Sequence, residues 1–174
     1  MSFVHLHNHT HFSILEWLPK PKDYLKKAKS LWMTAVAITD TSNIHGCHEF
    51  YKYSKDEWVK PILWTEIYLQ SDLDVKMFHK IVLLAKSFEW YKNIIALTTK
   101  ASLSISWDKA FITWEDLKNY SFDLICLSWP ITSEISYHIL AWFDEEKIVA
   151  KINQYIEVFK DDFYLELLYH DDIP

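Results

Sequence analysis

The sequence is nearly free of glycine and wholly free of arginine. It contains one glycine among 174 residues, and its eighteen basic residues, all lysines, face twenty-four acidic residues for a formal charge of −6. A protein that holds duplex DNA unaided presents a broad basic face of lysine and arginine. The charge balance therefore excludes an autonomous duplex-binding protein, and any nucleic acid must be held mainly elsewhere.

Cysteines and long apolar runs are also scarce. Cys47 and Cys126 are the only cysteines, and they lie too far apart in sequence for a C-x-x-C metal-binding turn. We expect both to be small buried side chains. No apolar run reaches the roughly 18 residues that a membrane-spanning helix requires, and the first residues form no basic leader. We therefore expect a cytoplasmic protein without membrane contacts.

Tryptophan is unusually abundant in this sequence, whereas glycine is unusually rare. The nine tryptophans and the one glycine together make up roughly 6% of the chain, which is close to the ordinary share of glycine alone. Trp32 follows an expected helix at its C-cap, and Trp129 follows an expected strand, two places where glycine is favoured. We hypothesise that the source reads the UGA codon as glycine. The alternative is a protein that is genuinely rich in tryptophan.

Half of the residues are apolar and they are spread along the chain, which favours a globular protein over a disordered one. We expect residues 1–174 to form a single domain. Short segments with the alternation of strands are separated by segments with the spacing of amphipathic helices. This order predicts an α/β fold with a largely parallel sheet, open or closed into a barrel, whose chemistry collects at the carboxyl ends of the strands.

The expected elements follow one another without an internal repeat or a linker. We expect strands at residues 3–9, 34–39, 61–68, 78–85, 124–128 and 163–168. We expect helices at residues 21–32, 91–99, 115–120, 134–141 and 145–159, and a further helix after residue 46 with Phe50 and Tyr51 pointing inward. Asp40 then follows a strand, while Glu66 and His79 lie within two others.

Four histidines stand at alternate positions near the start of the chain, at residues 5, 7, 9 and 11. Side chains two residues apart on a strand point to the same face, so His5, His7 and His9 can line one side together. Neutral imidazoles in such a row bind divalent metals well. A solvated or internally satisfied histidine is the better interpretation of a lone residue. Four at this spacing, followed by acidic residues at strand ends, favour a metal site.

Several motifs, in their order along the chain, resemble the PHP (polymerase and histidinol phosphatase) domain of bacterial DNA polymerase III alpha subunits. They are His7-x-His9-Thr10, Ser13 to Trp17, Ala37 to Asp40, Lys60 to Tyr68, Phe78 to Ala85, Trp90 to Asn93 and Leu127 to Trp129. The resemblance covers essentially the whole chain, although each motif alone is weak. Positions 17, 32, 58, 64, 90 and 129 are usually glycine in that family, which agrees with the recoding hypothesis.

The resemblance implies a distorted β/α barrel, incomplete at its C-terminus, with up to three zinc or manganese ions at the strand ends. It assigns ligand roles to His7, His9, Glu66 and His79, and to Glu16 where the family usually has aspartate. Asp40 would lie at the same rim, as a ligand or as an acceptor that orients an imidazole. Helix capping or loop hydrogen bonding is the alternative for the two acidic residues Glu16 and Asp40.

Two positions depart from the family pattern in ways that affect metal binding. Thr41 stands where the family has a histidine and Pro130 where it has a cysteine, and neither can bind a metal ion. The last family motif, Asp-x-His, should lie beyond Pro174. We therefore expect fewer metal ions than in the complete family site.

The resemblance implies a module of a replicative DNA polymerase whose nucleotidyl transfer takes place outside this chain. Its implied partners are the rest of the alpha subunit, DNA held through the full-length protein, a proofreading subunit and the sliding clamp. Within the chain it implies at most a metal-dependent phosphoesterase or 3′→5′ exonuclease. Two alternatives remain: a separate PHP phosphoesterase acting on an ester such as histidinol phosphate, and a non-catalytic scaffold.

Overall fold

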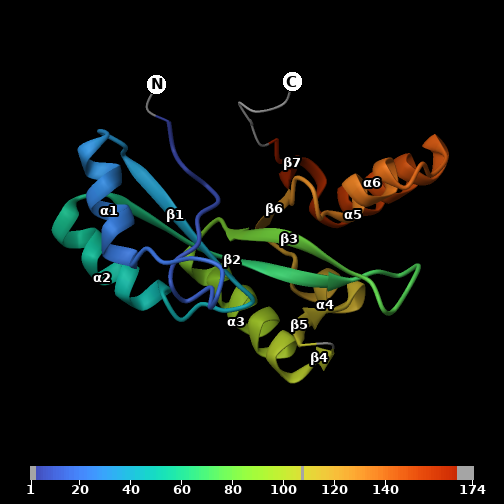
Figure 1. The fold of residues 1–174 in the computed structure, drawn as a ribbon, viewed down its shortest axis with the longest axis horizontal. Coiled ribbons are helices and arrows are strands. Elements are labelled where there is room, and N and C mark those ends of the chain that lie inside the picture. Colours follow the sequence, from blue (N-terminus) through green and yellow to red (C-terminus); the bar gives the residue numbers. More distant parts are fainter. Residues whose placement is uncertain (1–2, 107, 168–174) are drawn as a thin grey trace.

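The computed structural model describes residues 3–106 and 108–167, and strands and helices alternate along much of them (Figure 1). The strands are β1 (Ala35–Thr41), β2 (Lys60–Gln70), β3 (Phe78–Ala85), β4 (Ile105–Ser106), β5 (Lys109–Ile112), β6 (Leu124–Ser128) and β7 (Phe163–Leu165). The helices are α1 (Pro21–Ser30), α2 (Cys47–Glu57), α3 (Phe88–Leu103), α4 (Trp114–Tyr120), α5 (Glu134–Leu140) and α6 (Glu145–Phe159), with a 3₁₀ turn at Lys160–Asp162. None of the helices in these two ranges is long and apolar enough to cross a membrane.

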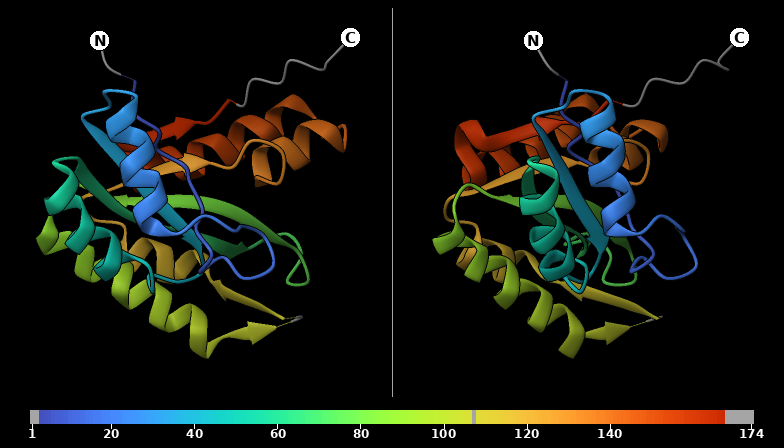
Figure 2. Two further views of the ribbon diagram at one scale, coloured as in Figure 1. Left: turned by 60° about the vertical axis from the view of Figure 1, so that its left-hand side comes forward. Right: turned by 90° about the vertical axis from the view of Figure 1, so that its left-hand side faces the viewer.

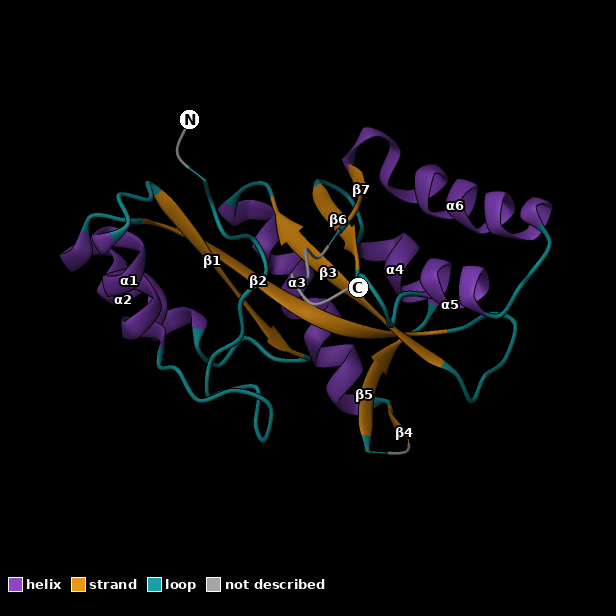
Figure 3. Ribbon diagram, turned by 45° about the horizontal axis from the view of Figure 1, so that its top comes forward, coloured by secondary structure: helices purple, strands orange, loops and turns teal. Residues whose placement is uncertain are grey.

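The strands form one sheet around β2 (Figure 3). Along one edge of β2 lie β1, parallel to residues 60–66, and β5, parallel to residues 68–69; β3 lies antiparallel along the other edge. Beyond β3 come β6, antiparallel, and β7, parallel to β6, while β4 pairs antiparallel with β5. The expectation of a largely parallel sheet was wrong, because a short connection joins β2 to β3 as a hairpin instead of a crossover helix.

Helices cover one face of the sheet. The main core cluster joins β2 and β3 to helices α3 to α6 through alternate strand residues, Ile67, Leu69, Ile81 and Leu83. A second cluster packs α1 and α2 against β1. Figure 2 shows α3 running along the sheet, with α1 and α2 beside β1. We call this the helix-covered face.

The inner face carries the other set of alternate side chains, with Ala37, Trp64, Val82, Leu84 and Leu127 in a smaller cluster. Residues 3–9 run beside β1, but no strand is assigned to them, contrary to expectation. The N–H groups of residues 37 and 39 donate to the carbonyls of residues 5 and 8. Three residues of the segment thus oppose two of β1, which breaks a regular ladder.

The remaining differences from the expected elements are small. The strands β4 and β5 were not anticipated, and Tyr51 is exposed whereas its neighbour Phe50 is buried. The last strand ends at Leu165, and residue 168 of the expected strand lies outside the described residues. Both cysteines are buried and free, as expected. The fold class is α/β, with the curved mixed sheet and outer helices of a distorted barrel.

Candidate metal centre

Three side chains meet on the inner face of the sheet. Nε2 of His7 lies 3.2 Å from Nε2 of His9 and 3.2 Å from Oε2 of Glu66. Nε2 of His9 lies 3.3 Å from the same carboxylate oxygen. Glu66 comes from β2, and both histidines come from the segment that runs beside β1. Each residue offers one ligand atom and these atoms lie within 4.8 Å of one another, so the group can hold a metal ion.

A chain of hydrogen bonds orients the ring of His9. The buried carboxylate of Asp40 accepts hydrogen bonds from the backbone N–H and the hydroxyl of Thr10, and from the hydroxyl of Ser13 at 2.8 Å. A carboxylate only accepts hydrogen bonds, so the single hydroxyl proton of Ser13 points to Asp40. The hydroxyl oxygen of Ser13 can then accept a hydrogen bond from Nδ1 of His9, 3.1 Å away. We infer that, with a metal ion bound, His9 would carry its proton on Nδ1 and present a lone pair on Nε2 to the centre.

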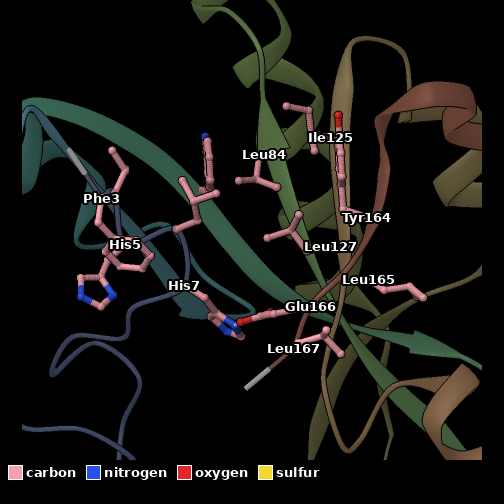
Figure 4. Close-up of a pocket in the computed structure, with 13 residues that line it drawn as sticks. Phe3, His5, His7, Leu84, Ile125, Leu127, Tyr164, Leu165, Glu166 and Leu167 are labelled. Carbon is pink, nitrogen blue, oxygen red and sulfur yellow. The ribbon is translucent and has the colours of Figure 1, made fainter. Parts of the chain in front are cut away.

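Glu166 orients His7 in the same way from the opposite side. Both carboxylate oxygens of Glu166 lie 2.9 Å from Nδ1 of His7, which makes that nitrogen a donor (Figure 4). Burial alone would lower the pKa of His7, but the carboxylates of Glu166 and Glu66 outweigh it and raise the pKa to about 9. In the absence of metal, His7 therefore holds a proton on Nε2. That proton occupies the place that a metal cation would take.

The two oxygens of Glu66 have different surroundings. Oε2 faces the imidazoles and also accepts a hydrogen bond from the indole N–H of Trp129. Oε1 lies 2.6 Å from the ammonium nitrogen of Lys80 and accepts from the hydroxyl of Thr41 at 3.1 Å. Burial alone would raise the pKa of Glu66, yet the imidazoles and Lys80 hold it well below its usual range. Glu66 is thus a buried, ionised carboxylate that requires positive charge beside it.

A cavity of about 830 Å³ lies beside the centre on the inner face. Its walls are mainly apolar side chains of the sheet and of residues 3–6, and His7 and Glu166 lie at its border. Figure 4 shows these two side chains pointing toward one another, with Leu127 and Leu84 further along the wall. The cavity gives a small molecule room next to the proposed ligands.

The structure brings together three of the six ligands that the resemblance implies: His7, His9 and Glu66. Glu16 lies at the edge of the group, where its carboxylate is 3.0 Å from the hydroxyl oxygen of Thr41 and 3.7 Å from the nitrogen of Lys80. Asp40 does not contact His9 directly; it accepts a hydrogen bond from Ser13, whose hydroxyl contacts Nδ1 of His9. This agrees with the role of an acceptor that orients an imidazole.

His79 lies on the helix-covered face, away from the other three. Successive side chains of a strand point to opposite faces. Lys80 on β3 reaches Glu66, so its neighbour His79 points away from Glu66 and shares a face with Ile81 of the main core. Burial lowers the pKa of His79 despite the nearby charge of Glu134. The structure therefore does not unite His79 with the proposed ligands.

Two residues of the centre were not anticipated from the sequence. Glu166 could have been found, because it is an acidic residue near the end of an expected strand, where site residues gather. Lys80 gave no such signal, since a charged lysine is not a metal ligand. Only the pairing of β2 with β3, which sets Lys80 opposite Tyr68, places its ammonium beside Glu66.

Comparisons with known proteins agree with this fold. The profile of the PHP domain matches residues 5–170. DNA polymerase III subunit alpha of Borreliella burgdorferi is 38% identical over 97% of this chain, and that of Thermus aquaticus is 35% identical over 98%. The chain spans 15% of the length of each of these two relatives.

Two solved structures share the fold at low sequence identity. A Bifidobacterium adolescentis protein, proposed to be a metal-dependent phosphoesterase, superposes with a TM-score of 0.63 at 14% identity, covering 95% of this chain and 77% of that one. An amidohydrolase from Chromobacterium violaceum gives 0.61 at 9% identity, covering 92% and 75%. The sequence profile covers nearly every described residue, and the chain therefore belongs to the PHP domain family.

Proposed function

We propose that this chain is the N-terminal PHP domain of a bacterial DNA polymerase III alpha subunit, and that it holds a divalent metal ion for phosphoester hydrolysis. The similarity to alpha subunits over nearly the whole chain supports the first part. The second part is carried by one observation: the Nε2 atoms of His7 and His9 converge on a buried oxygen of Glu66. Two imidazoles and one carboxylate form a ligand set that suits zinc or manganese.

The residues around the ligands supply orientation and charge. Glu166 and Ser13 hold the two imidazoles so that both Nε2 atoms face inward. Three protein ligands leave further coordination positions open, as catalytic metal sites require. A bound divalent ion would supply Lewis-acid activation of water and neutralise phosphate charge. Lys80 adds a fixed positive charge next to Glu66, where an anionic phosphate would approach.

We propose a single metal ion, fewer than the family maximum of three. Thr41 and Pro130 occupy two positions that carry ligands in the family, and His79 points to the other face of the sheet. Glu16, beside Thr41 and Lys80, is the remaining candidate for an additional ligand. Any hydrolysis would therefore be weaker than at a complete site.

The whole protein would have DNA-directed DNA polymerase activity in the cytoplasm, with nucleotidyl transfer performed outside this chain. Its partners would be the remainder of the alpha subunit, DNA, a proofreading subunit and the sliding clamp. This chain would then serve as a phosphoesterase or 3′→5′ exonuclease attached to the polymerase. The formal charge of −6 agrees with DNA being held mainly by other parts of the protein.

The test combines metal content with hydrolysis in the full-length protein. Wild-type protein should retain zinc or manganese after dialysis and degrade a single-stranded oligonucleotide from its 3′ end. Glu66→Gln should lose the metal and slow hydrolysis by more than about 100-fold. His48→Ala, an exposed histidine of α2, should match wild type.

Three other outcomes would contradict parts of the proposal. Hydrolysis of small phosphate esters alone, without oligonucleotide cleavage, would favour a separate phosphoesterase. Bound metal without any hydrolysis would leave a structural metal site. Absence of both would leave a non-catalytic scaffold.

A further inference from the structure

We propose that the natural residue at positions 32, 58, 129 and 142 is glycine, and that glycine at position 129 gives a metal ion access to Glu66. The first part depends on backbone geometry at three helix ends. The second part rests on the proposed metal site. Position 129 is thereby a determinant of metal binding, although it is not a ligand.

Three helices end at a tryptophan in the left-handed conformation. Trp32, after α1, has a φ of 56°, and Trp142, after α5, has the same value. Trp58, after α2, has a φ of 58° and a ψ of 34°. At such angles the Cβ of an L-residue lies too close to its own carbonyl oxygen, and glycine, which has no Cβ, avoids the strain.

The hydrogen bonds around these tryptophans identify a specific helix-ending motif. After α1, the N–H of Trp32 donates to the carbonyl of Lys29, and that of Met33 to the carbonyl of Ala28. Residues 142 and 143 repeat both bonds to residues 139 and 138 at the end of α5. After α2, the N–H of residue 59 donates to the carbonyl of residue 54, which is the bond of this pair that spans more residues. This is the Schellman motif, in which glycine usually occupies the left-handed position.

Nothing around these three side chains compensates for the strain. Trp32, Trp58 and Trp142 are 89%, 90% and 93% exposed. Large aromatic side chains normally gain stability by burial. Eight described residues other than glycine have a positive φ, and tryptophan supplies three of them, whereas it supplies nine of the 174 residues in the chain. Selection for tryptophan does not explain this placement, and a codon read as glycine does.

A separate observation extends the assignment to position 129, directly after β6. The indole N–H of Trp129 bonds to Oε2 of Glu66, the oxygen that faces both imidazoles. Its ring lies 5.6 Å from that of His7 between centroids. A metal ion held by these residues needs the same oxygen. Glycine at this position has no side chain to compete for it.

Mass spectrometry of the natural protein tests the first part. Peptides containing positions 32, 58, 129 and 142 are sequenced from protein isolated from its source. Glycine at all four positions is the expected result. Tryptophan at 32, 58 and 142 would overturn the assignment of these positions, whatever the metal site does.

Two matched variants of the full-length protein, produced with tryptophan at all nine positions, test the second part. Trp129→Gly should raise the affinity for Mn²⁺ or Zn²⁺ at least tenfold in calorimetry. Trp142→Gly, far from the ligands in sequence and exposed, should leave that affinity unchanged and raise the temperature at which this domain of the protein unfolds by about 2–4 °C.

The failures of the two proposals can be told apart. Equal metal affinity in the Trp129→Gly variant and its parent would overturn the role of position 129 while leaving the metal site in place. No metal binding in either protein would overturn the metal site itself, and with it the role of position 129. Neither result changes the residues found by mass spectrometry.

Discussion

Lys80 is the residue whose charge most directly affects Glu66. It lies on β3 with its nitrogen 2.6 Å from Oε1 of Glu66 and 3.7 Å from Oε1 of Glu16. The charges of Glu66 and Glu16 raise the pKa of Lys80 against the effect of burial, so Lys80 stays protonated. Its ammonium thus provides one of the positive charges that the buried Glu66 requires, on the side opposite the imidazoles.

Replacing Lys80 with methionine should destabilise the metal-free protein by about 2–4 kcal/mol, because a fully buried carboxylate loses its cation. Urea unfolding in the presence of a chelator measures the change. Lys76→Met, at an exposed position just before the same strand, should change stability by less than about 0.5 kcal/mol. Equal effects of the two substitutions would show that Lys80 does not stabilise Glu66.

His7 should make the stability of the metal-free protein depend on pH. Its pKa is about 9 in the folded chain, against 6.5 for an unperturbed histidine. Protonated His7 therefore stabilises the fold fully below about pH 6.5, and this contribution is lost as the pH rises through about 9. Unfolding free energies measured between these values test this dependence. Glu166→Gln should weaken it, and an unchanged pH profile in that variant would contradict the assigned partner.

The sequence identified the candidate ligands better than it identified the residues around them. The row of alternate histidines predicted a metal site that includes His7 and His9, and the family resemblance added Glu66. His79 was predicted with them but points to the other face, since the direction of a strand side chain depends on pairing that the sequence does not state. Lys80 and Glu166 depend on that same pairing, which explains why neither was anticipated.

At the scale of elements, a buried ionic group joins α5 and α6 to the hairpin between β2 and β3. Lys151 of α6 lies 2.5 Å from a carboxylate oxygen of Asp72 and 3.3 Å from one of Glu134, and Ser71 donates to Glu134 at 3.0 Å. Glu134 and Lys151 are almost completely buried. The hydrogen bonds of this group hold the two helices against the end of the hairpin.

Lys151→Met should destabilise the protein by about 3–5 kcal/mol, because it removes one partner of the buried ion pair with Glu134. Lys147→Met is the matched control. Lys147 lies one turn earlier on α6 and its side chain is 64% exposed, so its replacement should cost less than about 0.5 kcal/mol. Thermal unfolding of both variants measures these changes. A loss of stability of similar size in each would show that the ionic group does not stabilise the fold.

The order of elements was more predictable than their pairing. Every helix expected from apolar spacing is present, with α3 longer than its expected range. The prediction of a largely parallel sheet was wrong at β3. The apolar pattern of a buried strand does not show in which direction the strand runs relative to its neighbours. β4, of two residues, and β5, of four, are too short to show a period.

At the scale of the molecule, the proposed metal ion would join segments that are distant in sequence. His7 and His9 precede β1, whereas Glu66 lies on β2. A ligand that binds only the folded state at 100 times its dissociation constant stabilises it by about 2.7 kcal/mol. For a chain of this length that corresponds to an increase of roughly 5–10 °C in melting temperature.

Differential scanning calorimetry with and without Mn²⁺ or Zn²⁺ measures this increase. Glu66→Gln should abolish it, because the remaining imidazoles bind the ion too weakly. A rise in melting temperature that persists in this variant would place the metal elsewhere in the protein.

The hydrogen bond between His7 and Glu166 connects residues 159 positions apart. One imidazole therefore contacts the first and the last described segments, whose ends lie on the same side of the molecule in Figure 1. A fluorophore attached close to residue 3 or residue 167 would lie near His7, because both residues line the same cavity as that imidazole. The exposed turn between α5 and α6, at residues 141–144, is the better place for a probe of ion uptake.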